Sequence, residues 1–370
     1  MIGSEGVSVV AARNPIARGR CGPQTRGMTM PAHIEVELVE PGRIDEVLAD
    51  VVDLQRVVEA ETEPDDPPVP LAEVLGELTV PWPRHRYWTW VARIDGHLVG
   101  RLSASIDDRP ANRGFTEVEY LDVHPDARRH GAATALVRKA LPVLAEAGAT
   151  SIMAWPGTEE GLALSERIGL PPRQEERRSR LLVSDVDPAQ QHQWIEAPAA
   201  RSAGYDVVSF AGPVPDEFVA AWAAAADAMS DAPLDDLHWK HEPVTPEWVR
   251  GVEAMHAARG VARFGSLALS SDGEAAGMTL ILVRPDRAQL AHQEDTAVVP
   301  AHRGHGLGRW LKAANLAALR EAMPEVEIVQ TFNAESNGPM LDINVAMGFR
   351  PNRTFMACQA SVSEVVGRLG

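Results

Sequence analysis

Three glycines at alternate positions stand in the stretch VVPAHRGHGLGRWLKA, which spans residues 298–313. They are Gly304, Gly306 and Gly308. A β-branched run precedes them and a segment with helical apolar spacing follows, so the pattern predicts a turn from a strand into a helix. Backbone N–H groups in such a turn, at the positive end of the helix dipole, bind anionic groups such as phosphates. The spacing fits neither the G-x-G-x-x-G dinucleotide turn nor the Walker phosphate loop, because the glycine that each motif requires next is missing.

A related pattern occurs earlier in the chain. The segment VHPDARRHGAATAL, residues 123–136, aligns with VPAHRGHGLGRWL, which begins at Val299. The alignment pairs Arg128 with Arg303, His130 with His305, Gly131 with Gly306, and Ala133 with Gly308. The separation of the two segments is close to half of the 370 residues, so the sequence predicts one ancestral domain present twice.

The elements around each turn support this repeat. In the first half, apolar residues at helical spacing over residues 44–51 predict a helix, and two strand-like runs around Asp95-Gly96 predict a hairpin. A strand over residues 115–123 then leads into the turn. In the second half, Thr245-Pro246-Glu247 is typical of a helix start, and strand-like runs again precede the turn.

Composition sets the domain boundaries that we expect. The first thirty residues contain four arginines and one acid, and their apolar run is too short for a signal sequence. A polar, proline-bearing stretch lies near the middle of the chain. We therefore expect a disordered leader over residues 1–32, an N-terminal domain over 33–188, a linker over 189–205 and a C-terminal domain over 206–370.

The charge balance narrows the choice of partners. The formal net charge is −17, which argues against nucleic acid and against an anionic membrane surface as partners, and mildly favours cationic ligands. Two cysteines, Cys21 and Cys358, cannot build a disulfide framework, and no apolar run approaches the length of a membrane span. We expect a cytoplasmic protein.

In its order of elements, with a strand that carries V-x-P-x-x-R-x-x-G-x-[GA] into a helix, the sequence resembles the GNAT superfamily of acyl-CoA-dependent N-acetyltransferases. The resemblance covers nearly all of residues 33–370 as two tandem copies, a layout similar to mycothiol synthase and other actinobacterial tandem GNAT proteins. It implies an α/β (α+β) fold with two domains, each a central, mostly antiparallel mixed sheet flanked by helices.

The resemblance also implies acetyl-CoA as the co-substrate, with its pyrophosphate on the glycine turn and its pantetheine arm paired to the preceding strand. In the C-terminal copy the implied cofactor residues are Ala297, Val298, Val299, Arg303, Gly304, His305, Gly306, Leu307, Gly308, Arg309 and Asn337. In the N-terminal copy they are Leu121, Val123, Arg128, Arg129, His130, Gly131, Ala132 and Ala133. Because Arg129 replaces the glycine equivalent to Gly304, we expect weaker CoA binding, or none, in the N-terminal domain.

A second motif, in TFNAESNGPMLDINVAMGFR, retains the family's asparagine as Asn337. It has Asn344 at the position of the tyrosine that protonates the departing thiolate in relatives, and an amide cannot act as an acid, although it could bond the sulfur or position a water. The corresponding positions of the first copy are Thr158 and Ser165. We therefore regard the N-terminal domain as the more eroded copy and expect the chemistry in the C-terminal domain.

Acetylation of an amine requires a base, because an alkylamine is protonated at neutral pH. The resemblance places this base on the strand before the turn, HQEDTAVV in the second half. We favour Glu294, then His292, which alternation places on the same face, and then Asp295, although a β-bulge could reverse that assignment. Glu117 and Glu119 are the corresponding carboxylates of the first half.

Two acidic stretches lie where GNAT proteins shape the acceptor pocket, at residues 61–68 and 231–236. They are either solvated loops or a means of attracting a cationic acceptor. His238 and His241 lack a third ligand at fixed spacing, so we expect no metal.

Two functions remain open on the sequence. One is an N-acetyltransferase that acts on a primary amine of a small molecule, with the N-terminal domain completing the site. The other is a non-catalytic acyl-CoA-binding protein built on degenerate GNAT domains.

Overall fold

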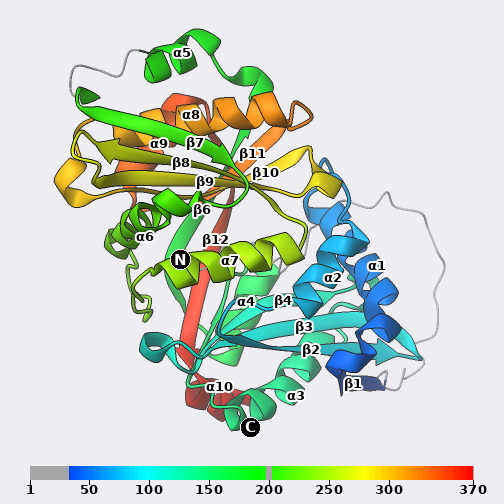
Figure 1. Cartoon of the computed structure of the whole chain (residues 1–370). Helices are drawn as coiled ribbons and strands as arrows, with labels where there is room; N and C mark the ends of the chain where they lie inside the picture. The colour runs from blue at the N-terminus through cyan, green and yellow to red at the C-terminus, as the bar shows by residue number, and fades with distance from the viewer. Residues whose placement is uncertain (1–32, 197–201, 370) are drawn as a thin grey trace.

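The structure is a computed structural model that describes residues 33–196 and 202–369 (Figure 1). The expected leader and Cys21 lie outside the described residues. The helices are α1 (Ile44–Thr62), α2 (Leu71–Thr79), α3 (Ala132–Glu146), α4 (Glu159–Ile168), α5 (Pro188–Glu196), α6 (Val219–Asp227), α7 (Pro246–Ala258), α8 (Leu307–Ala322), α9 (Gly338–Met347) and α10 (Val362–Leu369). In the described part of the chain, no helix is both long and apolar enough to cross a membrane.

The first six strands are β1 (Ile34–Leu38), β2 (His85–Ile94), β3 (His97–Asp107), β4 (Phe115–Val123), β5 (Ser151–Ala154) and β6 (Pro172–Leu182). The second six are β7 (Tyr205–Ala211), β8 (Ala262–Ser270), β9 (Ala275–Val283), β10 (Leu290–Val298), β11 (Ile328–Ala334) and β12 (Arg350–Ser361). All twelve form one sheet in the order β1-β2-β3-β4-β5-β12-β6-β11-β10-β9-β8-β7. Two neighbouring pairs are parallel, β4 with β5 and β10 with β11, and the other pairs of described strands are antiparallel. The predicted mixed, mostly antiparallel sheet with flanking helices is confirmed.

Local sequence signals account for several boundaries. The hairpin between β2 and β3 turns at Asp95 and Gly96, which both have positive φ, as the Asp-Gly pair predicts. Helix α7 begins after Thr245, whose side chain accepts a hydrogen bond from the N–H of Trp248. The predicted hairpin and helix start are therefore confirmed.

Successive residues along the strands point to opposite faces of each half-sheet, and different helices cover the two faces. In the N-terminal half, Trp90 packs in the core with Leu136 of α3, and its neighbour Val91 packs with Val51 of α1. In the C-terminal half, Leu280 packs with α6, and Ile281 packs with α8. Helices α1 and α2 therefore cover one face of the first half, and α3 covers the other.

The last strand of each half lies in the middle of the combined sheet. Strand β6 pairs with β11 over seven residues, and β12 pairs with β5 as well as with β6. Figure 1 shows β6 and β12 running between the two halves of the molecule. Each half therefore completes its sheet with the final strand of the other. Helix α5 (Pro188–Glu196), all but the first residue of which lies in the expected linker 189–205, packs on α8.

Candidate functional site

Both glycine turns adopt the same backbone conformation. Gly304 and Gly306 have φ of +82° and +77°, and α8 begins directly after them. Their counterparts Arg129 and Gly131 have φ of +68° and +96°, and α3 begins directly after them. The left-handed conformation costs a side chain such as that of Arg129 roughly 1 kcal/mol. The N-terminal turn thus retains the anion-binding geometry despite the loss of one glycine.

The arginine that precedes each turn braces the turn against its own strand. Arg128 donates to the main-chain oxygen of Val123 at 3.2 Å and pairs with Glu61 at 2.6 Å. Arg303 donates to the oxygen of Val298 at 3.0 Å and pairs with Asp231 at 2.8 Å. The two acidic stretches that we singled out in the sequence thus each supply a carboxylate to a turn.

An open groove of about 1020 Å³ lies at the N-terminal turn. It runs between α3 and α4 and along the end of β4. Its lining includes every predicted N-terminal cofactor residue except the exposed His130: Leu121, Val123, Arg128, Arg129, Gly131, Ala132 and Ala133. The volume is at the upper end of the range of roughly 300–1,000 Å³ that ligand pockets occupy.

The corresponding region of the C-terminal half is crossed by side chains. Thr331 of β11 donates to the main-chain oxygen of Gln293 on β10 at 3.1 Å, just past the last parallel pair of these strands. The equivalent residue of β5 is Ala154, which has no hydroxyl. Ile343 of α9 lies against Gly308, where a Cβ would be 3.0 Å from Ile343 Cδ1.

The other predicted C-terminal cofactor residues lie around this turn. Ala297 and Leu307 are buried, Val298 and Val299 are partly buried, and Asn337 precedes α9 without capping it through its side chain. The main-chain oxygen of His305 accepts a hydrogen bond from Ser202, and Arg309 lies over the ring of Trp194. The segments on either side of residues 197–201 therefore contact the C-terminal turn and helix.

Strands β4 and β10 diverge from their parallel partners at equivalent points. The last parallel pair is Glu117 with Met153 in the first half and His292 with Gln330 in the second. A β-bulge follows each, at Glu119 and at Glu294 with Asp295. The bulge that we raised as an alternative to simple alternation is therefore present in the C-terminal half.

The divergence point of the N-terminal half carries acidic groups with raised pKa. Burial, and then the nearby charge of Glu119, hold the pKa of Glu117 well above its usual value, while a hydrogen bond from Trp155 Nε1 at 2.9 Å opposes the shift. Glu119 accepts hydrogen bonds from Ser105 at 2.6 Å and Tyr87 at 3.2 Å. Burial also raises the pKa of Glu176, on β6, to about 7.

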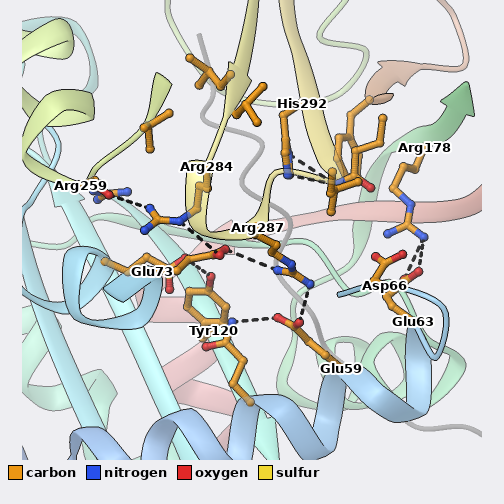
Figure 2. A pocket seen from close by; sticks show the side chains of 18 of the residues that line it. Glu59, Glu63, Asp66, Glu73, Tyr120, Arg178, Arg259, Arg284, Arg287 and His292 are labelled. Carbon is orange, nitrogen blue, oxygen red and sulfur yellow. Dashed lines mark hydrogen bonds and ion pairs between the residues drawn. The ribbon is translucent and has the colours of Figure 1, made fainter. Parts of the chain in front are cut away.

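A second cavity, of about 140 Å³, lies between the two halves (Figure 2). Its carboxylates come mainly from the N-terminal half: Glu59, Glu63, Asp66, Glu73, Glu77 and Asp122, with Glu294 from the C-terminal half. Its guanidinium groups come from the C-terminal half and the exchanged strands: Arg259, Arg284, Arg287, Arg178 and Arg353. The cavity therefore lies where an acidic wall meets a basic wall.

Ion pairs connect the two walls. Figure 2 shows Arg284 and Arg287 pointing toward Glu73 and Glu59. Arg287 lies 2.9 Å from Glu59 and 3.6 Å from Glu73, and Arg284 lies 3.3 Å from Glu73. Glu63 pairs with Arg178 at 2.8 Å. Residues 61–68, expected to be either solvated or directed at a cationic acceptor, thus also pair with the exchanged strands.

Of the four predicted catalytic residues, His292 and Glu294 line this cavity, and Asp295 and Asn344 do not. Burial, with help from Arg287, Arg180 and Arg178, lowers the pKa of His292 to about 4, so the ring is neutral at pH 7.

The two remaining candidates lie outside this cavity, where Asn344 is buried and Asp295 is partly buried. Burial raises the pKa of Asp295. Asn344 donates to the side-chain oxygen of Asn333 at 2.7 Å. The described residues include no group of three or more His, Cys, Asp or Glu placed to hold a metal ion.

Sequence reasoning missed the basic wall. Arg284 and Arg287 follow β9 in the segment VRPDRAQL, and a pair of arginines beside a proline is typical of a solvated loop. Only the acidic surface opposite them shows that they belong to a cavity. Their partners Glu59 and Glu73 lie outside the acidic run at residues 61–68, so that run gave no signal for these two arginines.

Comparisons with known proteins agree with this architecture. A family model described as Acetyltransferase (GNAT) family matches residues 53–167 and 227–341. Curated protein sequences include no match. A solved structure described as a tandem GNAT protein from the clavulanic acid biosynthesis pathway, without acetyl-CoA, is 27% identical with a TM-score of 0.74, and the match covers 89% of this chain and 99% of that one.

A GCN5-related N-acetyltransferase from Sphaerobacter thermophilus has the same fold, with 18% identity, a TM-score of 0.64 and coverage of 90% of this chain and 97% of that one. Both halves thus match a family model, and the whole chain matches a tandem arrangement of it. The chain therefore belongs to the GNAT family of acetyltransferases, in its tandem form.

Proposed function

We propose that this protein transfers an acetyl group from acetyl-CoA to a primary amine of a small molecule, and that CoA binds the groove of the N-terminal half. The observation that carries the proposal is the groove of about 1020 Å³ at the N-terminal turn. It combines a helix start for the pyrophosphate with the free edge of β4 for the pantetheine arm. The glycine pattern alone favoured the C-terminal half.

Two contacts support this choice between the halves. The hydroxyl of Thr331 bridges the diverging strands of the C-terminal half at 3.1 Å, and Ile343 lies against Gly308. In the N-terminal half Ala154 stands in place of Thr331, and Ala133 and Leu164 border the open groove. These contacts favour the groove of the N-terminal half as the place for an extended thioester arm.

The polar face of β4 supplies candidate chemistry. Glu117 lies on the strand that would pair with the pantetheine arm, and burial raises its pKa well above the usual value, which makes it a stronger base than an ordinary carboxylate. The protonated amine gives one proton to this carboxylate, and its nitrogen attacks the thioester carbonyl carbon. The carbon–sulfur bond then breaks, and the second proton that the nitrogen loses passes to the departing sulfur, so that CoA leaves as the thiol. Main-chain N–H groups would stabilise the negative charge on the carbonyl oxygen.

A matched pair of charge variants tests the location of CoA. Thr134 and Arg309 are each the third residue of their helices, α3 and α8. Glutamate in a first helical turn stabilises the helix but repels a bound pyrophosphate. We expect Thr134→Glu to weaken CoA binding by about tenfold or more in calorimetry, and Arg309→Glu to leave it nearly unchanged.

Weaker CoA binding in Arg309→Glu with near-normal binding in Thr134→Glu would place CoA in the C-terminal half. Unchanged binding in both variants would exclude both turns as the CoA site. CoA release measured with a panel of amines tests the transfer itself. A protein that binds CoA at the N-terminal turn and acetylates no amine would be the non-catalytic alternative.

A further inference from the structure

The cavity between the halves offers two kinds of charge to a ligand. Six of its carboxylates belong to the N-terminal half, and Arg259, Arg284 and Arg287 belong to the C-terminal half. Its volume of about 140 Å³ is that of roughly five water molecules, so it suits a small polar molecule. Tyr120 and Asp122 of β4 line it, which places it on the same strand as Glu117 and on the face that α1 and α2 cover.

The basic wall retains capacity to donate hydrogen bonds. The buried Nε atoms of Arg284 and Arg287 make no hydrogen bond within the described part of the chain, although Arg284 Nε lies 3.3 Å from a carboxylate oxygen of Glu73 and 3.3 Å from one of Asp286. The contacts of Glu73 with the two arginines, at 3.3 and 3.6 Å, are longer than the 2.7–2.9 Å that is usual for charge-assisted hydrogen bonds. These guanidinium groups can therefore accept a further anionic partner.

The charges around His292 point the same way. Arg287, Arg180 and Arg178 help burial to lower its pKa to about 4, while Asp66 opposes them. The ring lies beside these three guanidinium groups, each of which is also ion-paired: Arg287 with Glu59, Arg180 with Asp66 and Arg178 with Glu63. A carboxylate is the ligand group whose geometry guanidinium groups match.

We propose that the acceptor is a small amine that also carries a carboxylate, an amino-acid-like compound whose carboxylate binds Arg284 and Arg287 while its amine faces the acidic wall. The inference rests on the proposed acetyl transfer and adds the class of acceptor. It also assigns a role to the second half of the tandem, which supplies the wall that recognises the carboxylate.

Paired compounds that differ by one carboxylate test the proposal in the wild-type protein. Ornithine and 1,4-diaminobutane form one pair, and β-alanine and ethylamine form the other. A charge-assisted hydrogen bond corresponds to about ten- to a hundredfold in affinity, so we expect the carboxylate-bearing member to have at least about tenfold higher kcat/KM in one or both pairs. Equal or higher kcat/KM for the members without a carboxylate would overturn the proposal.

Calorimetry of the same compounds with CoA-saturated protein measures the preference for a carboxylate without turnover. Preferential binding of the carboxylate-bearing members supports the proposal even if no acetylation follows, and in that case only the proposed transfer fails. Absence of binding by all four compounds, or no preference, overturns it.

Variants assign the preference to the basic wall. Arg284→Gln and Arg287→Gln should each bring the ratio of kcat/KM between the two members of a pair toward one, with the affinity for CoA unchanged. Arg350→Gln, on an exposed residue of β12 away from the cavity, serves as the control and should retain it. A preference that survives in both cavity variants, folded as judged by circular dichroism, would contradict recognition by this wall.

Discussion

Arg287 of the C-terminal half lies 2.9 Å from Glu59 of the N-terminal half. Their side chains are only 11% and 18% exposed, so the pair lies largely out of water. It joins α1 to the loop between β9 and β10 at the edge of the cavity. The halves are thus held together by side chains as well as by the exchanged strands.

The first prediction concerns the stability that this pair provides. Glu59→Gln should lower the free energy of unfolding by about 1–3 kcal/mol, because it leaves the mostly buried guanidinium of Arg287 with only the more distant carboxylate of Glu73, at 3.6 Å. Urea unfolding at pH 7 measures the change. The matched control is Glu46→Gln, which breaks the exposed pair with Arg43 at 2.8 Å and should cost less than about 1 kcal/mol. Equal effects of the two substitutions would show that the interdomain pair is no more important than a surface pair.

The second prediction concerns the base. Glu117→Gln should lower kcat by about a hundredfold or more, as expected when a positioned base is removed. Because burial raises the pKa of Glu117, activity of the wild type should fall as pH decreases through that raised value, and the variant should lack this limb.

The carboxylate that the sequence favoured in the other half provides the control. Glu294→Gln changes the cavity wall and should alter the KM for the amine more than kcat. A large loss of kcat in Glu294→Gln, with Glu117→Gln near normal, would return the chemistry to the C-terminal half, as the sequence pattern suggested.

The third prediction concerns Glu176. Its folded-state pKa of about 7 lies above that of an unfolded glutamate, so the native state binds the proton more tightly. The stability from this group is fully present below the unfolded pKa and is lost as pH rises through about 7. Glu176→Gln should remove this dependence and stabilise the protein at pH 8 by up to about 3 kcal/mol. Urea unfolding at pH 5 and pH 8 tests it, with the exposed neighbour Glu175→Gln as the control. If the stability of Glu176→Gln kept the pH dependence of the wild type, the assignment of that dependence to Glu176 would be wrong.

The fourth prediction concerns Lys312 of α8, which is 1% exposed and lies over the ring of Phe349. Burial lowers the pKa of its amine to about 7, so between pH 7 and the pKa of the unfolded lysine the unfolded state binds more protons, and stability rises with pH. Lys312→Met should therefore stabilise the protein by a few kcal/mol, on the order of the shift in pKa, at pH 7 and below. The gain should shrink between pH 7 and pH 10, as measured by urea unfolding. Arg320→Met, on the same helix, is the control.

The local patterns of the sequence were sufficient for the family, the duplication and most elements. The glycine turns, the Asp95-Gly96 hairpin and the start of α7 at Thr245 depend on residues within a few positions of one another, and short-range backbone preferences decide such features. The mixed sheet with flanking helices followed from the same patterns and from the resemblance.

Tertiary structure alone decided which residues meet. The exchange of β6 and β12 pairs strands that are far apart in the chain, and no local signal specifies which edge a strand joins. The packing of the two halves against each other also brings Arg287 to Glu59 and forms the cavity between the halves. The N-terminal turn, which has one glycine fewer, borders an open groove, whereas in the C-terminal half Thr331 bridges β10 and β11 and Ile343 lies against Gly308. Whether a groove is open depends on packing between elements, which the spacing of residues in one element does not encode.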